Sequence, residues 1–190
     1  MRWPLSVTLA LAVVLLTGVT PAVGQEQRAL SLDDPISAFA PSSSRQPATA
    51  PVQALGTRLG SLRIPAIGLD HDLFAGVDLS VLSDGPGHWV GTASPGGHGN
   101  MVIAGHRTTH GAPFGDLDRL QRGDLILFDG RGGVDIMYSV TETLVVTPES
   151  LWITYETGDN IATLFACHPK GSARQRIVVR AKLVGDGKIA

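Results

Sequence analysis

Short apolar runs separated by glycine and proline make up most of the chain after residue 58. Residues 176–183 alternate strictly, with basic residues or valine at even positions and apolar residues at odd positions. Alternation with a period of two is the pattern of a half-buried β-strand. An apolar run at 160–167 precedes it, and a loop at 168–173 joins the two. This region therefore predicts a strand, a turn and a second strand.

The rest of the chain contains similar runs. Residues 59–77 predict two short strands broken at 65–68, because proline cannot donate to a central ladder. Further strands are expected at 101–104, 124–128 and 134–146, and single helical turns at 78–82, after residue 112 and within 147–160. About eight short strands with little helix predict a mainly β fold, closed into an eight-stranded barrel with short helical turns.

Composition narrows the function classes. The chain has 190 residues, enough for one ordinary domain, and its formal net charge is −2 with 17% charged residues. No basic patch of the kind that binds nucleic acid is expected. The glycine-rich stretch at 85–100 lacks the spacing of a phosphate-binding loop. The sequence also lacks a G-x-S-x-G serine and a paired-carboxylate motif of the glycosidase type.

The N-terminus has the pattern of an export signal. Arg2 precedes an apolar run at 5–19, and small residues follow at 22–24, at the spacing that a signal peptidase reads. Residues 1–24 are therefore expected to be a signal peptide or an uncleaved signal anchor, with the rest of the chain outside the cytoplasm. Residues 25–57 are rich in serine, proline and alanine and predict a flexible tether. The globular domain is then 58–190.

Cys167 is the one cysteine of the chain and closes the apolar run at 160–167. One interpretation is a buried, inert residue, since a cysteine outside a disulfide often packs as a small apolar side chain. The other is a nucleophile, because strand ends beside loops present reacting groups. A thiolate nucleophile needs a base, and His106 closes the run at 101–104 as Cys167 closes its own.

The other histidines offer a weaker alternative. His106 and His110 are four residues apart, as in zinc-binding helices, but the glutamate of such a motif is missing. Gly111 and Pro113 also oppose a helix there, so no metal site is expected. Three further histidines are expected to be solvated in loops: His71, His88 and His98.

A histidine, then a cysteine, then an arginine, each at a strand end, resembles the pattern of the sortases, cell-wall cysteine transpeptidases of Gram-positive bacteria. The resemblance covers residues 62–184. The family motif TLxTC corresponds to 163–167, with Cys167 as its last residue. The family histidine corresponds to His106 and the family arginine to Arg176. The string AGHRTTHGAPFGDL is most similar to class E sortases of actinobacteria, which favours Arg176 over Arg174.

Two positions differ from the family pattern. Ala166 stands where the family has threonine, so a hydroxyl that could help to hold the substrate or the oxyanion is absent. Trp89 stands where class E sequences tend to have tyrosine, and it is a candidate substrate-binding residue. The resemblance implies two further pocket residues, Ala104 and Phe165, two positions before the histidine and the cysteine.

The resemblance implies a transpeptidase that needs no metal or organic cofactor. Cys167 would form a thioester, His106 would move protons, and Arg176 would donate hydrogen bonds to the oxyanion. The implied partners are secreted proteins with a C-terminal LPxTG-like or LAxTG-like sorting signal and an amine of the peptidoglycan precursor, near the outer face of the membrane. Two alternatives stay open. One is a wall-associated thiol hydrolase or L,D-transpeptidase, although the serine and glycine usual before the latter's cysteine are absent. The other is a non-catalytic β-barrel binding module.

Overall fold

The computed structural model describes residues 54–129 and 133–185. The predicted signal segment and nearly all of the predicted tether lie outside these ranges. In the part of the chain that is described, no helix is long and apolar enough to cross a membrane.

The described residues contain eight strands and four short helical turns, joined by loops. The strands are β1 (Arg58–Ile64), β2 (Leu69–Ala75), β3 (Gly87–His88), β4 (Asn100–Ala104), β5 (Leu125–Asp129), β6 (Asp135–Val146), β7 (Ile161–His168) and β8 (Gln175–Gly185). The helical turns are η2 (Pro65–Ile67), α1 (Leu79–Leu82), η3 (Leu117–Arg119) and η5 (Leu151–Thr154).

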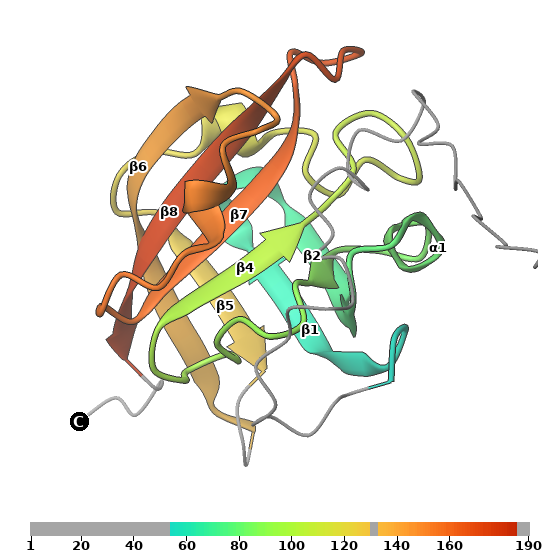
Figure 1. Cartoon of the computed structure of the whole chain (residues 1–190). Helices are drawn as coiled ribbons and strands as arrows, with labels where there is room; N and C mark the ends of the chain where they lie inside the picture. The colour runs from blue at the N-terminus through green and yellow to red at the C-terminus, as the bar shows by residue number, and fades with distance from the viewer. Residues whose placement is uncertain (1–53, 130–132, 186–190) are drawn as a thin grey trace, which may run out of the picture. The chain divides into compact units, whose positions relative to one another are not determined.

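The strands close into a barrel in the order β1-β2-β3-β4-β7-β8-β6-β5. The closed, mainly β barrel predicted from the sequence is therefore confirmed. Most neighbours are antiparallel, but β2 pairs with β3 and β4 pairs with β7 in parallel. Figure 1 shows β4, β7, β8 and β6 side by side, with the other strands behind them. Closure removes the sheet edges that an open sheet would leave for pairing with other chains.

Two apolar clusters lie on opposite faces of the sheet. The first takes residues from seven of the eight strands and fills the barrel; on β7 it includes Ala162, Leu164 and Ala166. The second lies on the outer face of β4, β7 and β8, beneath η5, and includes Phe165 and the half-buried Cys167. Alternate residues of 160–167 thus face the barrel interior and the outer cluster, and Cys167 lies on the outside of the barrel wall.

The glycine-rich segment at 85–100 differs from its prediction. It was expected to be a loop, but it contains the two-residue strand β3, which joins β2 to β4. A Cβ atom on Gly87 would lie 2.1 Å from the carbonyl oxygen of Gly76, so only glycine lets the two backbones approach this closely. A strand of two residues has no periodicity for a sequence pattern to reveal.

Two histidine predictions were wrong. His88 lies on β3 and is only 4% exposed, and its Nε2 donates to the carbonyl oxygen of Ala93 at 2.8 Å. His71 lies on β2 and is half-buried. Only His98 lies exposed in a loop, as expected. His88 lies on a strand of two residues, too short to be recognised from its pattern, whereas His71 lies on the second of the two strands expected within 59–77.

The chain joins the barrel just before β1. The backbone N–H of Gly56 donates to Ala75 on β2 at 2.7 Å, and Ala75 donates to Thr57 at 2.8 Å. The last residues of the segment predicted as a tether are therefore hydrogen-bonded to the domain.

Candidate active site

Three neighbouring strands bring Cys167, His106 and Arg176 to one end of the sheet. On the parallel pair β4 and β7, Ala104 is opposite Phe165, and the N–H of Gly105 donates to Phe165 at 3.2 Å. Two residues further along each chain come His106 and Cys167. Because parallel strands that start in register end at the same edge, these two residues lie on adjacent backbones, and neighbouring strands are about 4.8 Å apart.

Arg176 comes to the same place from the other side. On the antiparallel pair β7 and β8, Cys167 is directly opposite Arg176, so their side chains extend from the same face. Arg176 is fully buried, and its NH1 donates to the carbonyl oxygens of Ala173 and Gln175, each at 2.8 Å. Burial lowers the pKa of Arg176, and the charges of Cys167 and Glu149 oppose that shift. Arg174 is exposed in the loop before β8.

The residue before His106 must be glycine. A Cβ on Gly105 would lie 2.6 Å from the ring of Phe114, which is fully buried beneath the loop. The N–H of Phe114 in turn donates to the carbonyl oxygen of His106 at 3.0 Å. This close packing fixes where the chain turns after β4, and therefore fixes the position of the His106 backbone that carries the imidazole.

His110 stacks on His106. The ring centroids are 4.6 Å apart and the planes are inclined by 29°. His110 and Ala112 have positive φ angles of 50° and 49°, the only non-glycine residues of the described chain that do. Strained backbone of this kind clusters at functional sites, since the surrounding structure must hold it in place. The residues are not helical, as expected, and no group of three possible metal ligands occurs among the described residues.

The face beside the thiol is apolar. Ala104 and Phe165, the pocket residues implied by the sequence, are fully buried in the outer cluster. Trp89 belongs to the same cluster, and its ring centroid lies 6.2 Å from that of Phe165. The same cluster includes Ile153 of η5 and Val178 of β8. All three predicted substrate-binding residues therefore lie on the face that carries Cys167.

Comparisons with known proteins identify this arrangement. Residues 62–184 match the family model described as a sortase domain. The chain belongs to the sortase family. It is 31% identical over 158 residues to sortase SrtE2 of Streptomyces coelicolor, an alignment that covers 72% of this chain and 60% of that protein. The chain thus spans about three fifths of the length of that relative.

Solved sortase structures have the same fold. Sortase E from Streptomyces avermitilis is similar with a TM-score of 0.63 and 28% identity, over 70% of this chain and 91% of that one. A Clostridium perfringens sortase D5 transpeptidase is similar with a TM-score of 0.63 and 32% identity, over 69% and 81% of the two chains. The predicted resemblance to sortases, including those of class E, is confirmed.

Residues of the TLxTC segment have different structural surroundings in this sortase. The hydroxyl of Thr163 donates to Oδ1 of the fully buried Asn100 at 2.7 Å. Nδ2 of Asn100 donates to the carbonyl oxygens of Ile153 and Tyr155, which ties the connection at 147–160 to β4. Ala166 packs in the barrel interior, so a hydroxyl there would face the core and not the thiol. The expected loss of a substrate or oxyanion contact at this position is not supported by the geometry.

Two buried polar residues of the site region were missed from the sequence. Asn100 begins an apolar strand and gave no signal of its own. Arg107 directly follows His106, yet its side chain is only 1% exposed, and an arginine in a polar loop is normally solvated. Arg107 pairs with Asp118, at 2.8 Å.

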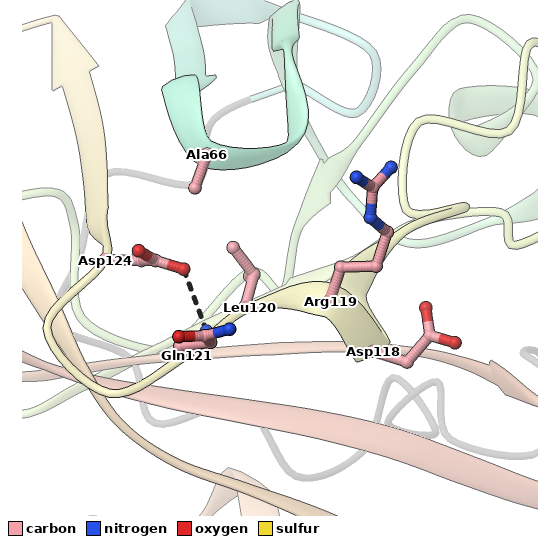
Figure 2. Close-up of a pocket in the computed structure, with 6 residues that line it drawn as sticks. All are labelled: Ala66, Asp118, Arg119, Leu120, Gln121 and Asp124. Carbon is pink, nitrogen blue, oxygen red and sulfur yellow. Dashed lines mark hydrogen bonds between the residues drawn. The ribbon is translucent and has the colours of Figure 1, made fainter.

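A shallow hollow lies beyond Asp118 (Figure 2). It is lined by Ala66, Asp118, Arg119, Leu120, Gln121 and Asp124. Figure 2 shows Ala66 of η2 on one side, with the residues of η3 and the following turn on the other. The backbone N–H of Gln121 donates to Asp124 at 2.8 Å. None of the predicted site residues lines this hollow, so the candidate active site is the outer face around Cys167.

Proposed function

We propose that this sortase is a cysteine transpeptidase that cleaves LPxTG-like or LAxTG-like sorting signals of secreted proteins and transfers them to a cell-wall amine. The observation that supports this most is the strand register. It puts His106 and Cys167 at adjacent parallel strand ends and Arg176 directly across from Cys167. On this proposal a nucleophile, a proton carrier and a cation come from neighbouring strand ends at one end of the sheet.

In the first half of the reaction, the Cys167 thiolate attacks the carbonyl carbon between threonine and glycine of the signal. Arg176 donates to the oxyanion that forms, because a guanidinium only donates and stays charged when buried. The carbon–nitrogen bond then breaks, and the His106 imidazolium gives its proton to the leaving glycine amine. A thioester on Cys167 remains.

In the second half, an incoming amine attacks the thioester and loses its proton to the neutral His106. The carbon–sulfur bond breaks, an amide forms, and the thiolate returns. Water is present at about 55 M in any dilute solution, so the amine must win by orientation. Well-oriented nucleophiles reach effective molarities on the order of 10⁵ M or more. The apolar cluster of Trp89, Ala104 and Phe165 is the proposed contact for the side chains of the signal.

The proposed setting is outside the cytoplasm. The sequence pattern at 1–24 favours export, either with cleavage or with an anchor that keeps the enzyme at the outer face of the membrane. Its partners there would be proteins that carry the sorting signal and the amine of the peptidoglycan precursor. Neither half of the reaction described above needs a metal or an organic cofactor.

The test is to incubate the purified protein with LPxTG and LAxTG peptides and rising concentrations of glycine-bearing amines. Products are identified by mass. The proposal predicts a shift from free acid to amide as the amine rises, with both products lost in Cys167→Ala. Acid alone at every amine concentration would favour a thiol hydrolase, and no turnover of any peptide would favour a binding module.

A further inference from the structure

Arg107 carries an unusual set of contacts for a residue beside a proton carrier. Its side chain is buried and reaches two separate parts of the chain, residues 115–118 and the end of β7. Nε donates to the carbonyl oxygen of Gly115 at 2.8 Å, and NH2 pairs with Asp118 of η3 at 2.8 Å. NH1 extends to the end of β7, 3.5 Å from the carbonyl oxygen of Cys167 and 3.4 Å from Nδ1 of His168.

These contacts connect the two residues that must react together. Arg107 is covalently next to His106, and through NH1 it lies against the backbone of Cys167 itself. The loop at 106–115 is closed by two hydrogen bonds. Nε of Arg107 donates to the carbonyl oxygen of Gly115, and the N–H of Phe114 donates to the carbonyl oxygen of His106 at 3.0 Å. The guanidinium therefore links the start of the loop, its end and the terminus of β7.

Stability alone does not account for an arginine here. Removing a cation from water is costly, and well-packed apolar residues of similar volume are often as stable as a buried ion pair. What arginine adds is a planar fork of five donors with fixed directions. A fork of that kind suits a position where three segments must keep one mutual arrangement.

We infer that Arg107 is a positioning residue that holds the His106 loop against the Cys167 strand end. It acts through these residues and does not touch the substrate. The inference rests on the proposed function, since it assigns Arg107 a part in the Cys167 and His106 chemistry. Misplacement of reacting groups by about 1 Å can lower a rate about 10²-fold, so loose anchoring should be visible in turnover.

The test compares Arg107→Gln and Arg107→Lys with Arg63→Gln. Arg63 is the control for the loss of an ion pair, because it also pairs with a carboxylate, Asp135, but its side chain is 34% exposed and it lies on β1, four strands from β7 around the barrel. Three quantities are measured: the melting temperature, kcat and KM for a sorting peptide, and the rate of Cys167 alkylation by iodoacetamide against pH. The alkylation profile needs no substrate and reports how cationic groups are placed around the thiol.

We expect kcat to fall about 10- to 100-fold in Arg107→Gln with KM nearly unchanged. Its alkylation profile should shift along the pH axis. Arg107→Lys keeps the charge without the fork, so it should recover part of the melting temperature but not kcat. Arg63→Gln should lower only the melting temperature. If Arg107→Gln behaves like Arg63→Gln, or if lysine restores kcat fully, the inference is wrong.

Two further outcomes are informative. If Arg107→Gln does not fold, Asp118→Asn removes one of the anchors through an exposed partner, and it should shift the profile in the same direction by a smaller amount. An unchanged profile in that variant would count against the inference. The wild type could also cleave no peptide, while the alkylation profile of Arg107→Gln is still shifted from that of the wild type. In that case the positioning role stands and the proposed substrate is wrong.

Discussion

Cys167 and Arg176 are direct cross-strand partners, with the thiol on β7 and the guanidinium on β8. Arg176 is fully buried, whereas Arg174 two residues earlier is exposed. Replacing Arg176 by alanine should lower turnover about 10²–10³-fold, because an oxyanion donor is lost. The measurement is kcat/KM for a sorting peptide. Arg174→Ala is the control, and an equal or larger loss in that variant would show that the wrong arginine has been chosen.

Gly105 should tolerate no side chain. In Gly105→Ala, the new methyl group would collide with the Phe114 ring, which cannot leave its buried site. Overpacking of this kind costs about 1–3 kcal/mol, and here the displaced segment carries His106. We expect a lower free energy of unfolding together with a larger loss of kcat than stability alone explains. Gly111→Ala, at a loop glycine with open space around it, is expected to keep more activity despite its positive φ of 74°.

The stacked pair His106 and His110 gives a separate test. If His110 orients the His106 ring by stacking, His110→Phe should keep most of the turnover, and His110→Ala should lower it several-fold. The stacking distance of 4.6 Å lies in the range that favours ring pairs. Turnover with a peptide is the measurement. Equal activity in both variants would mean that the stack has no part in the reaction.

His88 should make stability sensitive to acid. Burial lowers its pKa below the ordinary value of 6.5, against the opposing effect of the hydrogen bond to Ala93. Its Nδ1 has no hydrogen-bond partner among the described residues, so a proton there would find no acceptor. As the pH falls through 6.5, His88 binds a proton in the unfolded chain but stays neutral in the folded chain. The free energy of unfolding therefore decreases.

The measurement is the free energy of unfolding between about pH 7.5 and 5.5, compared with His88→Gln, which keeps an amide donor for Ala93. Below pH 6.5 the wild-type curve should fall more steeply, by at most about 1.4 kcal/mol per pH unit. His98→Gln, at an exposed loop position, serves as the control and should follow the wild type. Parallel curves for wild type and His88→Gln would contradict the assignment.

The sequence predicted the long, alternating strands well because each puts a clear apolar face on the barrel interior. The alternation at 176–183 sends Ile177, Val179 and Ala181 inward, and the same register leaves Arg176 beside Cys167. Strand β3 escaped prediction, since its two residues form a strand only by pairing with β2 and β4, and the pairing needs the close approach of Gly87 to Gly76. Local pattern cannot report a contact that depends on where distant segments meet.

The predicted site residues were found by chemistry and resemblance, not by periodicity. Cys167, His106 and Arg176 all lie at strand ends, and the fold brings those ends together. Their catalytic roles remain predictions. The anchors Asn100 and Arg107 could not be predicted, because a polar residue in a short segment is normally taken to face water. Their burial follows from the tertiary packing of 147–160 and 106–115 around the same strands.

The proposed mechanism requires a thioester between Cys167 and the sorting signal. The most direct measurement is the intact mass of the protein after rapid mixing with a LAxTG peptide and acid quenching. We predict a mass gain equal to the acyl fragment up to threonine, located on Cys167, absent in Cys167→Ala and discharged to an amide when an amine is added. Turnover that proceeds with no acyl mass on the protein, or that persists in Cys167→Ala, would contradict a thioester mechanism at Cys167.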